Sequence, residues 1–484
     1  MDSQNSNDKT TEKSGPSFYA IAALIVVTFF LVLNTYSGVF GQRTTDASDD
    51  GNLADSISAQ AGESSAPETL QPVVDDEPDD TDEADDEPDD TDEEDDETDE
   101  DHTEIPEGID IELAISEITV VDISEADAEI SETLSVVARN YNSVAVSLAV
   151  FDGELDFFTY QFGLAELAGR RDVDADTKFR IASLSKLVTV ILAMALVEAD
   201  ALDLDADISN YLGYEVRNPV SPETPITSRM LMQHTSSIID SDAYLSDRFT
   251  YSAETTGNLL GRSSSYSDNK PGTEHEYSDF GFIVLGAICE KVSDMLLDEL
   301  AAEVLFTPLR IDAAFVANNL ENKNIAAIYN ERHNETRSVR AQVEYGSSGN
   351  LSFHHNLSQG SLLISTVDYA RILSMLVNGG ELDGVRILSE DSVLEIHNTD
   401  FDAEHYQQGL ATRFQEAAFM DEDVYWHTGS AYGVFAQYIY SIEEGRGVVI
   451  VTTGATTDRE PNGMIKLCNA LAEVVWNALN PDAE

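Results

Sequence analysis

The pattern of apolar and polar residues separates a membrane-like segment near the N-terminus from the rest of the chain. Residues 17–40, "SFYAIAALIVVTFFLVLNTYSGVF", contain no charged residue, and residues 17–33 are almost entirely apolar. This length is close to the roughly 20 apolar residues that cross a bilayer. We predict a cytoplasmic tail over 1–16 and an uncleaved transmembrane signal anchor over 17–40, with a cleaved secretory signal as the alternative. Both interpretations place the remainder outside the cytoplasm.

Residues 41–114 have the pattern of a linker. A decapeptide repeats at its centre, as "DDEPDDTDEA", "DDEPDDTDEE" and the fragment "DDETDED". Residues 75–104 hold 22 acidic residues and no basic one, and this repulsion, with little apolar surface to bury, favours an extended, disordered chain. We predict a solvated acidic linker. A calcium-collecting or surface-tethering arm is the alternative function.

From residue 115 onwards the periodicity alternates between helix and strand. Residues 143–163 predict a hairpin with an Asp-Gly turn at 152–153, and residues 434–454 predict another, turning at 443–447. The stretch "GMIKLCNALAEVVWNAL" has an apolar period near that of an α-helix. We therefore predict an α/β (α+β) domain over 115–484, in which helices flank an antiparallel sheet built from both ends and a mostly helical region is inserted between them.

Charge narrows the classes of partner. The formal net charge is −66; residues 115–484 alone carry 58 acidic and 23 basic residues, and the whole chain has eight lysines. Such a surface repels nucleic acid and anionic lipid headgroups, so neither is expected as a partner. An acidic, lysine-poor domain suits a halophilic protein in concentrated salt, while an acidic secreted enzyme is the alternative.

The cysteines and histidines give no metal-site spacing. Cys289 and Cys468 each lie in an apolar helical pattern, so we expect two buried, unpaired thiols. His354 and His355 form an isolated doublet, and "HEYSD" at 275 lacks the second histidine of a zinc helix. We predict no metal.

A candidate nucleophile begins a strongly apolar stretch, "FRIASLSKLVTVILAMALVEA". Ser183 and Lys186 are one helical turn apart at the start of a helix predicted over 183–198. Burial of this helix is expected to lower the pKa of Lys186, so that the amine shares a proton with the hydroxyl. An N-cap role for Ser183 is the structural alternative. The other pairs of this spacing, Ser6/Lys9 and Ser267/Lys270, lie in polar segments.

Two further stretches supply the other groups that acyl transfer needs. "EYSDFGFIVLG" places Tyr277 before an apolar helix, and "YWHTGSAYG" places His427 and Gly429 before the strand that begins at Val434. A glycine there lets the backbone pass close to a substrate, and the N–H of Ser430 is expected to point into a cleft.

These motifs resemble the penicillin-recognising serine hydrolases: class C β-lactamases, D-Ala-D-Ala carboxypeptidases and related esterases and D-aminopeptidases. Five blocks occur in family order across most of 115–484: the nucleophile block around "IASLSK", "MLMQHTSS", "EYSDFG", "QGSLLISTVDYAR" and "WHTGSAYG". The resemblance implies a β-lactamase/transpeptidase-like fold. No Gly-x-Ser-x-Gly elbow occurs, which argues against an α/β-hydrolase.

The resemblance also implies roles for individual residues. Ser183 would be the acylated nucleophile, and Lys186 and Tyr277 would exchange its proton. In the segment from His427 through Thr428 and Gly429 to Ser430, the histidine would bind a substrate carboxylate. The backbone N–H groups of Ser183 and Ser430 would form the oxyanion hole. No cofactor is implied.

Three residues depart from the family pattern, two of them at positions that contact the substrate and one in a turn. Asp279 stands where β-lactamases have an asparagine, and a carboxylate there repels a substrate carboxylate. Ser237 replaces a glycine of a turn, and His427 replaces a permanently charged lysine. We therefore predict a membrane-tethered, extracytoplasmic hydrolase of esters or D-amino-acid peptides, a weak β-lactamase at most. A catalytically weak ligand-binding or sensor module, or a surface protein whose acidic arm is the working part, are the alternatives.

Overall fold

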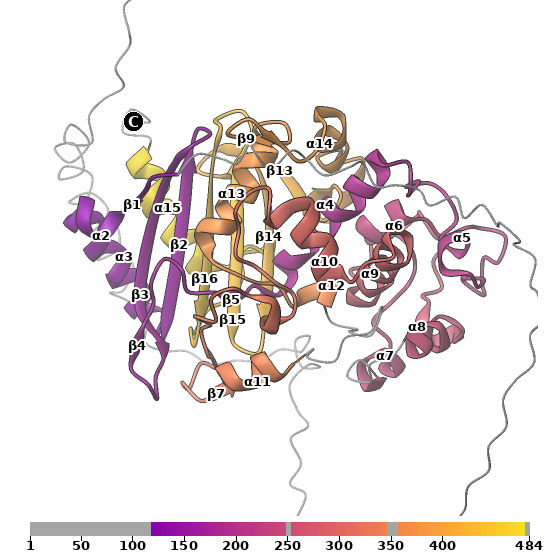
Figure 1. The fold of residues 1–484 in the computed structure, drawn as a ribbon, viewed down its shortest axis with the longest axis horizontal. Helices are drawn as coiled ribbons and strands as arrows, with labels where there is room; N and C mark the ends of the chain where they lie inside the picture. The colour runs from indigo at the N-terminus through magenta and orange to yellow at the C-terminus, as the bar shows by residue number, and fades with distance from the viewer. Residues whose placement is uncertain (1–117, 248–252, 346–356, 480–484) are drawn as a thin grey trace, which may run out of the picture. The chain divides into compact units, whose positions relative to one another are not determined.

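The centre of the fold is one ten-stranded sheet, seen in a computed structural model that describes residues 118–247, 253–345 and 357–479 (Figure 1). In spatial order its strands are β1 (Val120–Asp122), β3 (Asp156–Glu166), β2 (Ala145–Asp152), β16 (Arg446–Thr453), β15 (Val434–Ser441), β14 (Glu422–Ala431), β13 (Arg413–Phe419), β12 (Tyr406–Gln408) and β11 (Phe401–Ala403). The tenth strand, β4 (Arg171–Asp172), pairs with β3.

The two predicted hairpins are confirmed, and they meet in the middle of the sheet. β2 and β3 join through Gly153, which has a φ of +74°, and β15 and β16 join through Gly445 at +68°. β16 then pairs antiparallel with β2 along its whole length, from Arg446 opposite Asp152 to Thr453 opposite Ala145. Every residue of β16 is buried, as expected for a strand covered on both faces.

The predicted antiparallel sheet is confirmed for all pairings of the described sheet except one, at its edge. β1 runs parallel to β3. The helices α2 (Ile123–Ala126) and α3 (Ala128–Asn140) lie between β1 and β2 in the chain, so β1 is free to join the outer side of β3 without a hairpin. The four strands β11 to β14 also extend the sheet beyond the two predicted hairpins.

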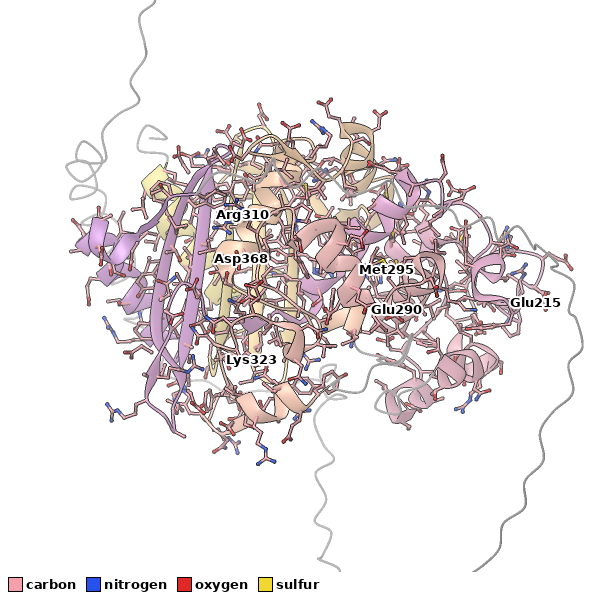
Figure 2. All side chains as sticks on the ribbon, in the orientation of Figure 1. Glu215, Glu290, Met295, Arg310, Lys323 and Asp368 are labelled. Atoms are coloured by element: carbon pink, nitrogen blue, oxygen red, sulfur yellow. The ribbon has the colours of Figure 1, made fainter. Side chains whose placement is uncertain are left out.

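Helices cover the sheet. α13 (Thr366–Val377) packs on β2 and β16 and lies in front of the sheet in Figure 1, whereas the predicted closing helix, α15 (Lys466–Leu479), packs against α3, β15 and β16 behind it. Ser365 caps α13 by accepting a hydrogen bond from the backbone N–H of Asp368. The Asp368 carboxylate pairs with Arg371 at 3.1 Å, and Figure 2 shows Asp368 over the sheet. This is a typical helix start.

The remaining helices confirm the predicted insertion between the strands from the two ends. Its core is α4 (Ser185–Glu198) packed against α9 (Asp279–Ser293), and both helices are buried along most of their length because they are apolar on nearly every face. The shorter helices are α5 (Ser209–Leu212), α6 (Ser228–Met232), α7 (Asp242–Asp247), α8 (Ala253–Leu260), α10 (Leu297–Ala301), α11 (Val339–Glu344), α12 (Leu357–Gly360) and α14 (Glu390–Ile396). Single turns are η1 (Ala182–Leu184), η2 (Ser263–Ser265), η3 (Ala302–Phe306) and η4 (Ala317–Asn319).

Three small two-stranded sheets connect these helices. They pair β5 (Phe179–Arg180) with β8 (Leu363–Ile364), β6 (Ile328–Tyr329) with β7 (Glu335–Arg337), and β9 (Glu381–Leu382) with β10 (Val385–Arg386). The strand β5 comes just before η1 in the chain, so its pairing with β8 fixes the segment that carries Ser183.

The cysteine prediction is confirmed, because Cys289 and Cys468 are both buried and unpaired. The segments predicted as membrane anchor, acidic linker and histidine doublet, at 17–40, 41–114 and 354–355, lie outside the described residues. Within 118–247, 253–345 and 357–479, none of the helices has the length and apolar composition needed to span a bilayer. The same residues contain no cluster of three metal-ligating side chains.

Candidate active site

Ser183 lies in a tight turn before the helix rather than in it. The turn η1 spans Ala182–Leu184, and α4 begins at Ser185, so the predicted helix start at Ser183 is two residues early. Ala182 has a φ of +49°, an unusual backbone conformation for an alanine. Ser183 is half-buried and faces a cavity. It is not the N-cap of α4, because that position belongs to Leu184.

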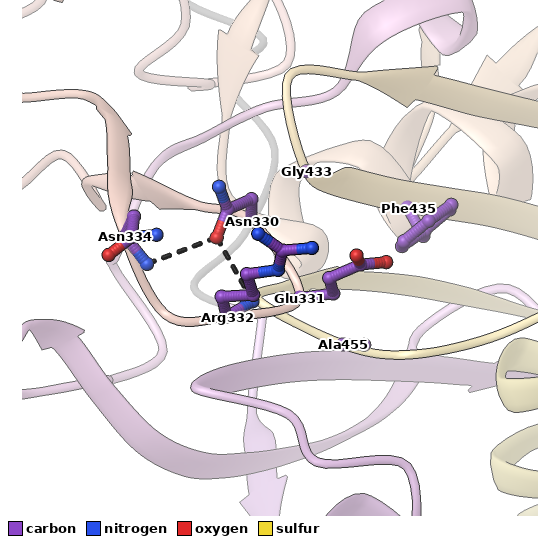
Figure 3. A pocket seen from close by; sticks show the side chains of 7 residues that line it. All are labelled: Asn330, Glu331, Arg332, Asn334, Gly433, Phe435 and Ala455. Carbon is purple, nitrogen blue, oxygen red and sulfur yellow. Dashed lines mark hydrogen bonds between the residues drawn. The ribbon is translucent and has the colours of Figure 1, made fainter. Parts of the chain in front are cut away.

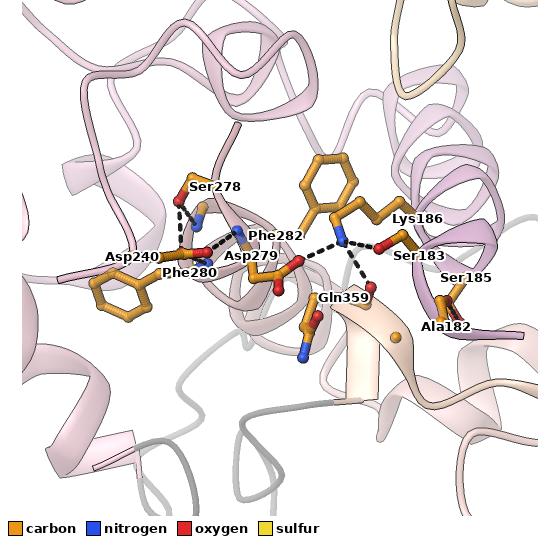
Figure 4. Close-up of polar contacts among 12 residues, drawn as sticks. Ala182, Ser183, Ser185, Lys186, Asp240, Ser278, Asp279, Phe280, Phe282 and Gln359 are labelled. Carbon is orange, nitrogen blue, oxygen red and sulfur yellow. Dashed lines mark hydrogen bonds and ion pairs between the residues drawn. The ribbon is translucent and has the colours of Figure 1, made fainter. Parts of the chain in front are cut away.

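Lys186 points back from the first turn of α4 to three oxygen atoms (Figure 4). Its Nζ lies 3.3 Å from Ser183 Oγ, 2.7 Å from Asp279 Oδ1 and 2.8 Å from the carbonyl oxygen of Gln359. An ammonium group has three N–H donors, so these three acceptors satisfy it completely. The side chain of Lys186 is 0% exposed, whereas that of Asp279 is 33% exposed.

The expected lowering of the Lys186 pKa is wrong. Burial, the largest influence, does lower the pKa, but the Asp279 carboxylate and the Tyr277 phenol act against it, and the pKa is raised above its ordinary value. The local sequence shows the burial of this helix, but it does not contain the Asp279 carboxylate, which comes from α9. Lys186 is therefore held as an ammonium ion at neutral pH.

Asp279 is placed by the start of α9. Ser278 caps this helix by accepting a hydrogen bond from the N–H of Gly281. A second carboxylate, that of Asp240, accepts hydrogen bonds from the N–H groups of Asp279 and Phe280, at 3.1 and 2.8 Å. Burial and then the nearby Asp279 charge raise the pKa of Asp240. Two carboxylates thus lie together at the N-terminus of one helix.

Tyr277 lies between two histidine rings. Its ring centroid is 4.2 Å from that of His234 and 6.3 Å from that of His427, and Lys186 Nζ is 5.0 Å from its centre. Burial is the main cause that lowers the pKa of both histidines well below the ordinary value; for His427 the cations Arg413 and Lys186 add to it. Both rings are therefore neutral.

The structure does not place His427 where a substrate carboxylate would reach it. The side chain is buried at 1% exposure and is absent from the wall of the cavity. Neither ring nitrogen has a hydrogen-bond partner among the described residues. The structure brings His427 beside Tyr277, behind the cavity wall.

The strand β14 packs directly against the turn η1 that carries Ser183. Residues His427 to Ser430 precede the strand β15, as predicted, and they lie inside the strand β14. A Cβ on Gly429 would lie 2.4 Å from the carbonyl oxygen of Ile181 and 3.2 Å from the backbone nitrogen of Ser183, so only glycine permits this approach. Thr428 does not line the cavity beside Ser183, and its hydroxyl accepts a hydrogen bond from Arg459 at 2.9 Å.

A cavity of about 240 Å³ opens beside these groups. Of the predicted site residues it is lined by Ser183, Asp279 and Ser430, while Lys186, Tyr277 and His427 are not part of its lining. Its other lining residues are Arg180, Ala182, Tyr244, Gln359, Gly360, Ala431 and Tyr432. Sequence analysis missed Arg180 and Gln359. The first lies three residues before Ser183, and the second lies in the "QGSLLIS" block, so both positions carried a signal.

A second cavity, of about 260 Å³, lies on the other side of the β14–β15 turn (Figure 3). It is lined by Asn330, Glu331, Arg332, Asn334, Gly433, Phe435 and Ala455. It contains none of the predicted site residues.

The segment "QHTSS" keeps the backbone shape of a glycine turn without the glycine. Ser237 has a φ of +64°, and His234 has one of +57°. Asn218 donates a hydrogen bond to Ser237 Oγ at 2.9 Å, which helps to hold the serine in this conformation. The departure at Ser237 therefore leaves the turn intact.

The sheet and its helical insertion, together with the Ser183–Lys186 pair, define a β-lactamase/transpeptidase-like fold of the serine hydrolase type. The β-lactamase family profile matches residues 127–468, which is most of the chain, and the chain belongs to that family.

Two curated relatives show how distant the family members are. A Mycobacterium tuberculosis protein is 28% identical over 252 residues, covering 46% of this chain and 61% of the relative. The esterase EstB of Burkholderia gladioli is 27% identical over 213 residues, covering 41% of this chain and 53% of the esterase. The chain thus matches less than two thirds of the length of either relative.

Two solved structures have the same fold. EstCE1, a hydrolase with promiscuous acyltransferase activity, matches with a TM-score of 0.60 and 18% identity, covering 73% of this chain and 100% of that one. A class C β-lactamase matches with a TM-score of 0.56 and 17% identity, covering 73% of this chain and 96% of that one.

Proposed function

We propose that this protein hydrolyses an ester or a D-amino-acid peptide or amide bond through an acyl-enzyme on Ser183, with weak β-lactamase activity at most. The main support is the contact between Lys186 Nζ and Ser183 Oγ, in a turn that opens on a cavity and is held against Gly429. A serine nucleophile needs an oriented hydroxyl and a neighbouring group that accepts its proton, and we assign these roles to Lys186, which donates to Ser183 Oγ, and to Tyr277.

In the proposed reaction Ser183 Oγ attacks the substrate carbonyl. Tyr277 takes the serine proton and passes it to the leaving group, so that no net proton is gained or lost. Lys186 remains an ammonium ion, because Asp279 raises its pKa, and it orients Ser183 Oγ by donating to it. The backbone N–H groups of Ser183 and Ser430 stabilise the oxyanion. Water then attacks the acyl-enzyme by the reverse proton path.

The esterase or peptidase branch is favoured over the β-lactamase branch by the charges around the cavity. Asp279 presents a carboxylate to the cavity, and His427 is neutral and buried, so it offers no charge to a substrate carboxylate. The esterase EstB among the relatives agrees with this choice.

A catalytically weak ligand-binding module of the same fold is the second candidate. It is favoured by the complete satisfaction of the Lys186 ammonium, which leaves this group no capacity to act as a base. The two candidates differ in turnover, since a binding module would retain ligand without releasing a hydrolysed product.

Covalent labelling tests the nucleophile. We expect a fluorescent fluorophosphonate to label wild type and not Ser183→Ala, with weak or no label from a fluorescent penicillin. Ser267→Ala is the matched control, because Ser267 and Lys270 have the same spacing in a polar segment. Equal labelling of Ser183→Ala and wild type would refute the assignment, and rapid penicillin turnover would refute the choice of branch.

We also propose that residues 17–40 tether the enzyme to the membrane with the catalytic domain outside the cytoplasm, and that the acidic linker is a spacer. Protease added to intact cells should then remove the chain beyond Arg43, and full protection would contradict the topology. Deleting residues 75–104 should leave hydrolysis unchanged; a loss of activity would favour a working role for the acidic arm.

A further inference from the structure

The Lys186–Asp279 pair presents its negative end to the cavity. Lys186 is 0% exposed and Asp279 is 33% exposed, and only Asp279 of the two lines the cavity. A ligand therefore meets the carboxylate first, although the pair as a whole is neutral. This orientation is opposite to what a substrate carboxylate needs.

The groups around Asp279 do not cancel this polarity. The N-terminus of α9 would ordinarily attract an anion, but Asp240 already accepts its N–H groups at Asp279 and Phe280. His427 and His234 are neutral because burial lowers their pKa values. Among the residues that the structure describes, this wall of the cavity consequently has no cation that faces a ligand.

The positive side of the cavity lies elsewhere. Arg180, which also lines the cavity, is held by the carbonyl oxygen of Gly360 at 3.2 Å and by Ser361 Oγ at 2.7 Å. It stacks near the ring of Tyr432, with 5.9 Å to the ring centre. Arg180 therefore belongs to the wall formed by the 360–361 segment and the β14–β15 turn.

Asp279 is also close to the reacting atom. Lys186 Nζ donates hydrogen bonds to both Ser183 Oγ, at 3.3 Å, and Asp279 Oδ1, at 2.7 Å. The distance between these two oxygen atoms therefore cannot exceed the sum of the two hydrogen-bond lengths. A group three or four bonds from the scissile carbonyl would reach the carboxylate. At such a separation a unit charge still interacts strongly in a partly desolvated site.

We propose that Asp279 is a specificity-determining residue that selects substrates with a positively charged amine a few bonds from the scissile carbonyl and disfavours substrates with a carboxylate there. This inference rests on the proposed function and names the substrate class of the same site. The proposal assigns a function to Asp279, the residue that stands where the family pattern has an asparagine.

The test compares three fluorophosphonates that differ only in the tail: a trimethylammonium group, its uncharged tert-butyl isostere and a carboxylate. Each reacts once with the nucleophile, so no turnover or known substrate is required. Rates of Ser183 modification are measured by intact mass for wild type, Asp279→Asn and Asp312→Asn. Both substitutions remove one negative charge, but Asp312 pairs with Lys178 away from the cavity, so the control has the same net charge as the test variant.

We expect wild type and Asp312→Asn to react about tenfold faster with the cationic than with the uncharged probe, and slowest with the anionic probe. In Asp279→Asn the three rates should fall within about twofold of one another. Equal rates in wild type, a faster anionic probe, or an unchanged preference in Asp279→Asn would each overturn the proposal. If Asp279→Asn does not fold, Asp279→Ser is measured in its place against Asp312→Ser, because the net charge of −66 alone would favour the cationic probe in wild type. Failure of all three probes to modify Ser183 would instead refute the proposed function and the inference with it.

Discussion

The described part of this domain contains two lysine–aspartate pairs of almost equal length in which the lysine is buried, and in one of them the lysine also contacts a serine hydroxyl. Lys178 and Asp312 are 2.8 Å apart with side chains 4% and 21% exposed, and Lys186 and Asp279 are 2.7 Å apart with side chains 0% and 33% exposed. Their length and burial do not distinguish them.

The difference lies in the third partner. The Asp312 carboxylate also accepts the backbone N–H groups of Glu321 and Asn322, so that pair fastens a loop. The third partner of the other pair is Ser183 Oγ, and its carboxylate faces a cavity. A buried ion pair is therefore a structural element in one place and a candidate catalytic device in the other, depending on what completes it.

We expect the largest effect when the lysine of each pair is replaced in turn. Lys186→Met should lower the rate of ester hydrolysis and of fluorophosphonate labelling by roughly 10³-fold, because it removes the cation that orients Ser183. Lys178→Met should leave both rates within about twofold of wild type while costing roughly 1–3 kcal/mol of stability. Rates come from p-nitrophenyl acetate, and stability from urea unfolding. Similar losses of activity in the two variants would remove the distinction.

The same comparison explains what the sequence could predict. The hairpins of β2–β3 and β15–β16, the helix over 185–198 and the serine–lysine spacing all depend on local periodicity, so they were predictable. The pKa of Lys186 depends on a carboxylate 93 positions away in the chain, and no local pattern contains it. Likewise, the sequence placed "HTG" ahead of the strand at Val434, but the position of these residues inside β14 and the burial of His427 depend on how β14 packs against η1.

A second prediction concerns the backbone contact that fixes the nucleophile. Gly429→Ala should reduce labelling of Ser183 by about 10²-fold, because the new Cβ would lie 2.4 Å from the carbonyl oxygen of Ile181 and displace the turn. Gly257→Ala is the control, since its Cβ would meet nothing closer than 3.5 Å. Labelling of Gly429→Ala at the wild-type rate would show that the strand does not position Ser183.

A buried carboxylate that has no ion-pair partner among the described residues, Asp298, provides a further contrast with the two pairs. Burial raises the pKa of Asp298 to about 6, against which the N–H groups of Phe315 and Val316 act in part. A pKa raised in the folded state means that the native protein binds the proton more tightly, so stability should fall as the pH rises from about 4 to about 6. We expect the stability difference between wild type and Asp298→Asn to change by about 2 kcal/mol across this range in urea unfolding. A flat difference would mean that hydrogen bonds offset the burial.

The smallest effect is expected at an exposed pair. Arg340 and Glu344 are 85% and 61% exposed, so water screens their attraction. Arg340→Ala should leave both the urea midpoint and the labelling rate at the wild-type values. A measurable loss would show that exposure does not rank these ion pairs as assumed.

The central claim is that a substrate acyl group passes through Ser183. It is tested most directly by quenching the protein in acid during turnover of an ester and mapping any acyl adduct by peptide mass spectrometry. We expect one adduct, on the peptide that contains Ser183, which forms and decays with the reaction. Turnover with no adduct on Ser183, or with the adduct on another residue, would contradict it.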